Sequence, residues 1–322
     1  MTDRRTFVSA VALALLAVPR LSRAQQPVIG FVRSSSIEAV PHMVAAFRQG
    51  LRETGYVEGQ SVAIEFRSAE DDYARLQVII AELVRRPVAV LVANSTAARL
   101  AKAATTTIPI VFANAGDPVR DGLVASLNRP GGNMTGVSFL GSDLGGKKLE
   151  LLRALVPKAR TIGVMENPNS AVTQSERMEV QTAARATGQR VIVVGAGTEQ
   201  DFETAFTTLT RERAGGLLVT GDALFASRKG KLVALAARHR LPTIHTDRTV
   251  VEAGGLMSYA ASIADAYHQV GVYTGRILKG EKPGDLPVMQ PTKFELTINA
   301  RTAKTLGLAI SPSLKLQADI IE

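Results

Sequence analysis

The chain has no cysteine and no tryptophan among its 322 residues, and aromatic residues make up only 5% of it. Without cysteine there can be no disulfide bond, no thiolate nucleophile and no cysteine for lipid attachment. The histidines show no metal-ligand spacing with one another or with nearby carboxylates; they are His42, His239, His245 and His268. We therefore expect neither a metal ion nor another cofactor.

The sequence also lacks a hydrophobic run long enough to cross a membrane. Its most apolar stretch, residues 9–18, is about 11 residues long with its flanks, whereas a spanning helix needs about 20. Hydrophobic residues make up 46% of the chain and charged residues 21%, as in globular proteins. A length of 322 residues is enough for two domains of ordinary size.

The N-terminus has the pattern of an export signal. Arg4 and Arg5 precede the apolar run, and residues 22–24, Ser-Arg-Ala, offer a small-x-small cleavage site. Paired arginines followed by x-Phe resemble a twin-arginine signal. We expect cleavage of residues 1–24 after Ala24 and a periplasmic protein. Ordinary secretion and an uncleaved membrane anchor are the alternatives.

The excess of positive charge is modest. The whole chain has 38 basic and 29 acidic residues; the signal contains four Arg and one Asp, which leaves 38 − 4 = 34 basic and 29 − 1 = 28 acidic residues, a net charge of +6. Nucleic-acid binding would require a clustered basic face or a recognisable reading motif, and the sequence has neither. We expect a solvated surface and no nucleic-acid partner.

The mature sequence repeats one layout of short apolar strands alternating with helices. Gly30 and Gly163, Gly55 and Gly188, and Pro109 and Pro242 are each separated by 133 residues (163 − 30, 188 − 55, 242 − 109). Strands that alternate with helices predict parallel sheets covered on both faces. The fold class is therefore predicted to be α/β, with two doubly wound parallel-sheet lobes joined by three crossover segments.

The repeat also predicts how the chain is divided between the lobes. One large doubly wound sheet is the alternative, but the matched segments at the end of each copy favour separate lobes. We expect the helices at about 144–155 and 263–278 to pack on the lobe opposite to the strands that precede them. The predicted units are lobe one, 25–136 with 262–288; lobe two, 140–258 with 292–322; and crossovers near 133–140, 254–262 and 288–293.

Several motifs resemble those of the ABC-transporter substrate-binding proteins related to tryptophan and tyrosine uptake. They span the mature chain: 116–119 (GDPV), 122–124 (GLV), 130–137 (PGGNMTGV), 280–288 (GEKPGDLPV) and 294–308 (FELTINARTAKTLGL). The resemblance implies a type I periplasmic-binding-protein fold, a solute in the cleft between the lobes and a permease in the inner membrane. The loop after the third strand departs from the family pattern, so an aromatic amino acid is not assumed.

Candidate ligand-binding residues follow the carboxyl ends of the predicted strands, where parallel sheets bind ligands. Those of lobe one are Ser34, Ser35, Ser36, Asn94, Ser95, Thr96 and Asn114, and those of lobe two are Asn167, Asn169, Ser170, Asp222, Asp247 and Tyr259. Ser95 and Thr96 at a helix start are suited to a carboxylate, and Asp222 is suited to an ammonium group. For all three, capping of the next helix is the alternative.

These observations favour a protein that binds a small polar solute, an amino acid or similar carboxylate, by hinge closure of two lobes. An exported enzyme is the first alternative, although the sequence shows no nucleophile, base and orienting residue as a set. A ligand-sensing protein on the same fold is the second. A transcription regulator would require a DNA-binding headpiece where this chain has its export signal. We expect a monomer.

Overall fold

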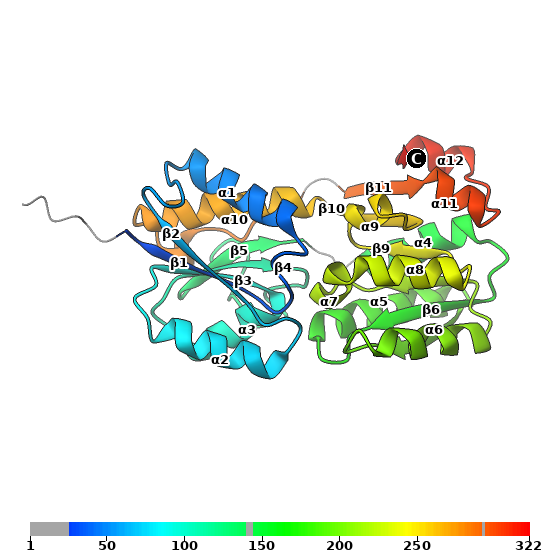
Figure 1. The fold of residues 1–322 in the computed structure, drawn as a ribbon, viewed down its shortest axis with the longest axis horizontal. Coiled ribbons are helices and arrows are strands. Elements are labelled where there is room, and N and C mark those ends of the chain that lie inside the picture. The colour runs from blue at the N-terminus through cyan, green and yellow to red at the C-terminus, as the bar shows by residue number, and fades with distance from the viewer. Residues whose placement is uncertain (1–25, 140–143, 292–293) are drawn as a thin grey trace, which may run out of the picture.

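The computed structural model describes residues 26–139, 144–291 and 294–322, and the predicted export signal lies outside these ranges. Two α/β units lie side by side, each built on its own sheet (Figure 1). We call the five-stranded sheet and its helices lobe one, and the seven-stranded sheet and its helices lobe two. Within the described ranges, no helix is long and apolar enough to cross a membrane.

The sheet of lobe one has the strand order β2-β1-β3-β4-β5, and all of its strands are parallel. Its central strands are buried along their whole length, as expected for a sheet covered by helices on both faces. The elements are β1 (Val28–Arg33), α1 (Pro41–Glu53), β2 (Ala63–Ser68), α2 (Tyr73–Val84), β3 (Val90–Asn94), α3 (Ser95–Ala104), β4 (Ile110–Asn114) and β5 (Met134–Ser138).

Lobe two repeats this order as β7-β6-β8-β9-β10 and extends it with β11 and β12. The added β11 runs antiparallel to β10, so the second sheet is mixed rather than wholly parallel as predicted. The elements are α4 (Gly145–Leu155), β6 (Thr161–Glu166), α5 (Ala171–Ala186), β7 (Arg190–Gly195), α6 (Asp201–Arg211), β8 (Gly216–Val219), α7 (Ala223–Ser227), α8 (Lys229–Arg238), β9 (Thr243–His245), α9 (Arg248–Glu252), β10 (Met257–Ala261), β11 (Phe294–Asn299), α11 (Ala300–Thr305), α12 (Pro312–Gln317) and β12 (Ala318–Ile321).

The landmarks of the sequence repeat have matching structural roles. The carbonyls of Pro109 and Pro242 each accept a hydrogen bond, at 2.8 Å, from the neighbouring strand's leucine amide, Leu91 or Leu217. Gly55 and Gly188 each follow the C-terminus of a helix with positive φ (+92° and +65°), a conformation that favours glycine. The repeat is therefore a repeat of structure.

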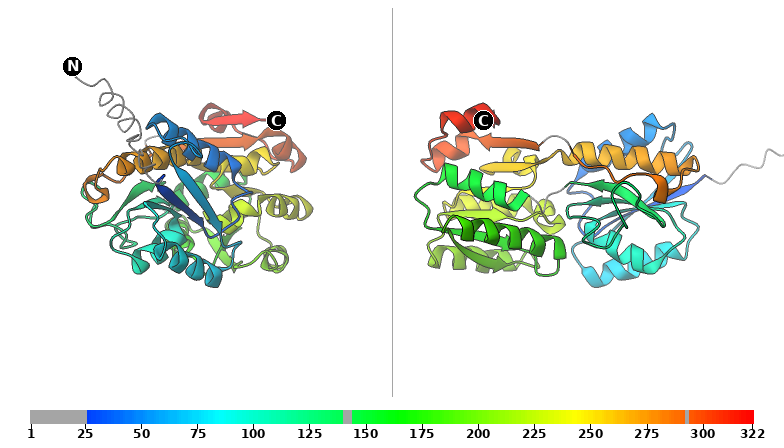
Figure 2. Two further views of the ribbon diagram at one scale, coloured as in Figure 1. Left: turned by 60° about the vertical axis from the view of Figure 1, so that its left-hand side comes forward. Right: turned by 180° about the vertical axis from the view of Figure 1, so that it is seen from behind.

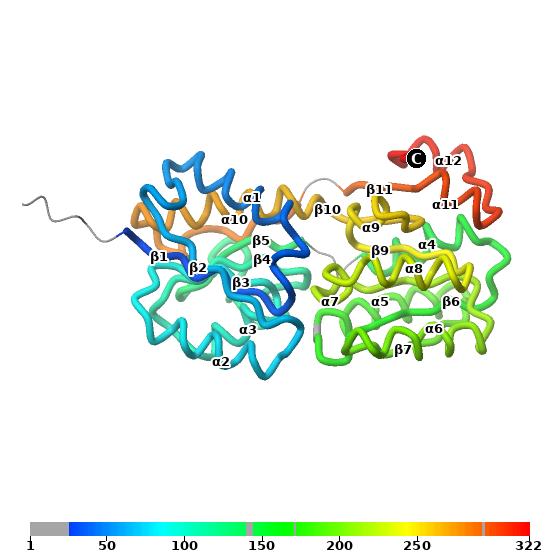
Figure 3. Tube along the Cα trace, in the orientation of Figure 1, coloured from blue at the N-terminus to red at the C-terminus, as the bar shows by residue number. Residues whose placement is uncertain are grey.

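The chain passes between the lobes three times, and Figure 3 shows the described segments on either side of these passages. The first passage follows β5 and the third precedes β11. Residues 140–143 of the first and residues 292–293 of the third lie outside the described ranges. The second is described throughout: β10 ends at Ala261, and Ser262 caps α10 (Ile263–Leu278). Before the third passage, after the short 3-10 helix η2 (Pro283–Asp285), Met289 pairs with β5.

The helix after each of the first two passages packs on the lobe that the chain has just entered. Helix α4 contributes to the core of lobe two, whereas α10 lies along α1 in lobe one, as the views from behind and from the side also show (Figure 2). Two glycines make the α1–α10 contact close. A Cβ atom at Gly50 would lie 2.0 Å from the carbonyl oxygen of His268, and one at Gly271 would lie 2.2 Å from that of Phe47.

Candidate ligand-binding site

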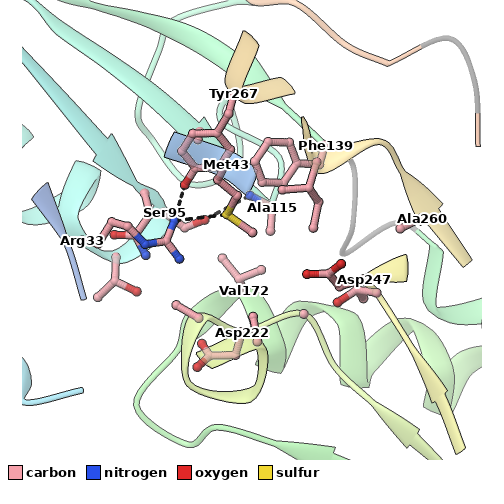
Figure 4. Close-up of a pocket in the computed structure, with 18 of the residues that line it drawn as sticks. Arg33, Met43, Ser95, Ala115, Phe139, Val172, Asp222, Asp247, Ala260 and Tyr267 are labelled. Atoms are coloured by element: carbon pink, nitrogen blue, oxygen red, sulfur yellow. Dashed lines mark hydrogen bonds between the residues drawn. The ribbon is translucent and has the colours of Figure 1, made fainter. Parts of the chain in front are cut away.

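A pocket lies between the carboxyl ends of the two sheets and is lined by residues of both lobes (Figure 4). Its lobe-one wall is formed by Arg33 at the end of β1, by Met43, by the start of α3, by Phe139 and by Tyr267 of α10. Its lobe-two wall is formed mainly by small residues and by two carboxylates, Asp222 and Asp247. Each lobe therefore supplies a wall of different chemical character.

Arg33 is the cationic group of the lobe-one wall, and only 3% of the residue is exposed. Its Nη1 donates to the Tyr267 hydroxyl and contacts the Met43 sulfur at 3.6 Å, and its Nη2 donates to Ser35 Oγ at 3.2 Å. The guanidinium also lies 5.8 Å from the Tyr267 ring centroid. Within the described residues its Nε has no hydrogen-bond partner. The guanidinium is thus a buried positive charge in the lobe-one wall.

The N-terminus of α3 also faces the pocket, through Asn94, Ser95 and Thr96. Asn94 occupies the N-cap position, but its side chain makes no capping hydrogen bond and pairs with Ser34 instead, donating to Ser34 Oγ at 2.9 Å. The Asn94 side chain therefore connects α3 to the end of β1 and does not cap its own helix. Ser95 Oγ accepts from the Ala115 amide at 3.0 Å. The N-terminus of a helix favours negative charge, so this part of the lining suits an anionic group.

Asp222 lies at the carboxyl end of β8, and its hydrogen-bonding capacity is largely occupied. Its Oδ1 accepts from Asn167 Nδ2 at 3.0 Å and from the Leu224 amide at 3.0 Å, which makes it the N-cap of α7. Burial raises the pKa of Asp222, and hydrogen bonds from Asn167, Leu224 and Ser170 oppose that rise. Asp222 thus has the capping role that was the alternative to ligand contact.

Asp247 caps α9 with one oxygen, which accepts from the Thr249 amide at 2.8 Å. The residue is 7% exposed, and its carboxylate is drawn pointing toward the middle of the pocket, below Phe139 (Figure 4). Across the lobes, the neighbouring His42 on α1 has a lowered pKa because burial disfavours its charged form, although Asp247 opposes that effect. Asp247 therefore has more capacity than Asp222 to receive a ligand cation.

A buried ion pair lies beneath the lobe-two wall. Lys148 of α4 and Glu176 of α5 are hydrogen-bonded, and both side chains are completely buried. The second oxygen of Glu176 accepts from the Gly221 amide at 2.8 Å. Burial raises the pKa of Glu176, and Lys148 opposes the rise. Burial, together with the charge of Lys148, lowers the pKa of the nearby His245 to about 3.

At its edge the pocket is bridged by direct contacts between the lobes. Asn167 Nδ2 donates to the Tyr73 hydroxyl at 2.7 Å, and Arg228 lies 3.3 Å from Asp71. Asp71 has a φ of +68° and a pKa raised by burial, and burial also raises the pKa of Tyr73. These contacts hold the loop before α2 against lobe two.

The thirteen candidate residues from the sequence fall into three groups. The structure brings six of them to the pocket lining: Asn94, Ser95, Thr96, Ser170, Asp222 and Asp247. Five are buried outside that lining: Ser34, Ser35, Ser36, Asn114 and Asn167. The last two lie elsewhere: Asn169 is exposed, and Tyr259 stacks on Phe294 with ring centroids 6.1 Å apart. Direct ligand contact by any of the thirteen stays a prediction.

Sequence reasoning missed the aromatic and cationic part of the lobe-one wall. Arg33 stands at the end of a predicted strand beside the serines that were chosen, so its position was a usable signal. Phe139 follows the end of β5, and Tyr267 lies on α10, 128 residues later in the chain (267 − 139). Their ring centroids are 6.4 Å apart in the structure. Within the described residues no cluster of His, Cys, Asp or Glu could hold a metal ion.

The sequence matches one protein family and a curated relative over most of its length. The family model described as "ABC transporter substrate binding protein" matches residues 28–321. A tyrosine-binding protein of Clostridioides difficile (strain R20291) is 31% identical over 278 residues, which cover 86% of this chain and 78% of that protein.

Two solved structures show the same fold with different degrees of likeness. The ABC domain from Streptococcus pneumonia in complex with L-Trp has a TM-score of 0.83 at 26% identity, covering 92% of this chain and 100% of that one. The ligand-free, open structure of a substrate-binding protein with adhesive properties from Clostridium difficile has a TM-score of 0.63 at 27% identity, covering 92% and 99%.

Proposed function

The chain belongs to the family of ABC transporter substrate-binding proteins, and from this premise we propose that it binds one amino acid between its lobes and delivers it to a membrane permease. The observation that carries the proposal is the pocket itself. It combines a buried arginine and a helix N-terminus on one wall with a pocket-facing carboxylate on the other. An α-carboxylate and an α-ammonium group complement these two walls.

An aromatic side chain is the best match to the remaining surface. Phe139, Tyr267 and Met43 form an apolar patch on lobe one, and aromatic rings pack favourably against one another and against the methionine sulfur. The relatives that bind tyrosine or L-Trp support this assignment. We therefore propose L-tryptophan or L-tyrosine as the ligand. The sequence alone did not support this choice, because the loop after the third strand departs from the family pattern.

Closure of the lobes on the ligand is part of the same proposal. At nearly equal identity, the chain is more similar to the structure with bound L-Trp than to the open one, and the contacts of Tyr73 with Asn167 and of Asp71 with Arg228 bridge the lobes. Both observations support a closed arrangement. The bodies that move are residues 25–136 with 262–288 and residues 140–258 with 292–322, and they turn about the three passages.

The cellular setting follows from the family, which suggests a location outside the cytoplasm. We propose a periplasmic monomer, exported by the twin-arginine signal and cleaved after Ala24, with an inner-membrane permease as its partner. No catalytic step is part of this function. The N-terminal sequence of the protein recovered from the periplasm tests the cleavage site, and its absence from the periplasm would contradict the assignment.

Isothermal titration of the mature protein with L-tryptophan, L-tyrosine, L-leucine and L-glutamate tests the proposed ligand. We expect the aromatic amino acids to bind at least tenfold more tightly than the other two. A saturating ligand also stabilises the fold, by about 2.7 kcal/mol at 100 times its dissociation constant. Folded protein that binds neither aromatic amino acid would contradict the proposal, and N-acetylated ligands should bind weakly because they lack the ammonium group.

A further inference from the structure

The pair formed by Lys148 and Glu176 connects three segments of lobe two directly behind the pocket. Lys148 lies on α4, Glu176 lies on α5, and the second carboxylate oxygen of Glu176 accepts from the amide of Gly221 at 2.8 Å. Gly221 lines the pocket and immediately precedes Asp222. The pair therefore contacts the backbone of the pocket wall itself.

Stability alone does not account for this pair. Transfer of two charges out of water costs several kcal/mol each, and replacement of a buried ion pair by apolar residues of similar volume is often neutral or stabilising. Neither side chain has any exposed surface, so the full desolvation cost applies here. What the carboxylate supplies, and an apolar side chain does not, is an acceptor for the Gly221 amide.

The position of α4 gives the pair a second connection. α4 is the first helix after the chain passes from lobe one to lobe two, and it packs closely on α5: a Cβ atom at Gly145 would lie 2.9 Å from the carbonyl oxygen of Glu176. Lys148 thus fixes Glu176 from the helix that leads in from the first passage. Glu176 in turn holds the Gly221 peptide, which immediately precedes Asp222, the N-cap of α7.

We propose that Lys148 and Glu176 are positioning residues of the ligand site, which hold the Gly221–Asp222 loop of lobe two in the conformation that receives the amino acid; this inference rests on the proposed function. Glu176 acts through its hydrogen bond to the Gly221 amide. Lys148 neutralises Glu176 and fixes its orientation. Neither side chain contacts the ligand.

Two double variants separate positioning from charge burial. Lys148→Met with Glu176→Gln removes both charges but keeps an oxygen that can accept from the Gly221 amide. Lys148→Met with Glu176→Leu removes both charges and the acceptor. With L-tryptophan and L-tyrosine as probes in isothermal titration, we expect the glutamine variant to bind within threefold of the wild type and the leucine variant to bind at least tenfold more weakly.

Hydrogen exchange of the Gly221 amide, followed by NMR on protein labelled with 15N-glycine, provides a readout that does not depend on the ligand. Exchange should be slow in the wild type and in the glutamine variant, and at least tenfold faster in the leucine variant. The matched control is Arg177→Met with Glu166→Leu, which removes a partly buried ion pair that also joins α5 to the sheet but lies outside the pocket lining. This control should change neither affinity nor Gly221 exchange.

Each outcome is decisive. Equal weakening in the glutamine and leucine variants, or wild-type affinity in a folded leucine variant, overturns the proposal. If the leucine variant does not fold, rapid exchange of Gly221 in the wild type or a tenfold loss of affinity in the glutamine variant overturns it. If the wild type binds neither amino acid, the proposed function fails, and Gly221 exchange in the ligand-free proteins still decides the positioning role.

Discussion

The two lobes share one strand order but offer the ligand opposite chemistry. Lobe one presents a buried arginine, a helix N-terminus and an aromatic patch, whereas lobe two presents carboxylates among small residues. The post-strand loops of a repeated fold can thus diverge while the sheets beneath them stay the same. Under the proposed function, a ligand with two opposite charges contacts both walls only when the lobes are closed, which would link recognition to closure.

The two lobes also differ in the residues that support the pocket walls from behind. In lobe one, Arg33 is held by neutral partners, namely Tyr267, Met43 and Ser35. In lobe two, the wall is backed by the fully buried Lys148–Glu176 pair and by His245, which burial keeps uncharged. The cationic wall therefore depends on hydroxyl and sulfur contacts, while the acidic wall depends on a charged network.

Removal of the lobe-one cation is expected to have the largest effect. Arg33→Met should weaken amino-acid binding about a hundredfold, or about 2.7 kcal/mol, because a buried charge-assisted contact to the carboxylate is lost. Isothermal titration measures the change. Arg48→Met, which removes an arginine from the outer surface of the same lobe, is the control and should bind normally. Normal binding by the Arg33 variant would show that lobe one does not recognise the carboxylate through this residue.

Acid should weaken lobe two through His245. Its pKa is about 3 in the folded protein and about 6.5 in the unfolded chain, so only the unfolded chain takes up the proton between these values. The stabilisation is complete above pH 6.5 and is lost as the pH falls, by about 1.4 kcal/mol per pH unit.

Denaturant unfolding of the wild type and of His245→Gln between pH 7 and pH 5 tests this expectation. The variant should lose about 2 kcal/mol less stability over that range. His239→Gln, which replaces a half-buried histidine of the same lobe, is the matched control. Parallel curves for the wild type and the His245 variant would mean that this histidine does not set the acid sensitivity of lobe two.

The two carboxylates of lobe two should differ in their importance. Asp247→Asn should weaken amino-acid binding about tenfold, because its carboxylate faces the pocket. Asp222→Asn should weaken binding less than threefold, because the Oδ1 of Asp222 already accepts from both Asn167 and Leu224 and asparagine is an equally good helix cap. Isothermal titration of both variants compares them directly, and the reverse order would assign the ammonium group to Asp222.

The smallest effect is expected from the bridge at the edge of the pocket. Asp71→Asn preserves the positive φ, which asparagine tolerates, but removes the ion pair with Arg228. Because such partly exposed pairs contribute about 0.5 kcal/mol, affinity should fall about twofold and the effect should vanish in high salt. Small-angle scattering without ligand should show a more extended population, and an unchanged profile would contradict a role in closure.

Much of the architecture could be predicted from the sequence because strands and helices leave periodic patterns. The repeat at 133 residues predicted that the same succession of strands and helices occurs in both lobes, and six of the candidate residues at strand ends line the pocket. The antiparallel β11 could not be predicted in the same way, since strand direction depends on where the third passage enters the sheet. Tyr267 was also missed, because a tyrosine on a helix gives no sign of the distant Arg33 that its hydroxyl meets.

The glycines between α1 and α10 have a mechanical consequence. The α1–α10 contact leaves no room for a side chain at either glycine, so α10 packs closely on lobe one. α10 begins at Ile263, one residue after the cap Ser262 and two after the end of β10. At the second passage, any turning of the lobes is therefore concentrated as torsion in the backbone of Ala261 to Ile263. Under the proposed closure, Gly50 and Gly271 therefore place the pivot of the second passage at these residues.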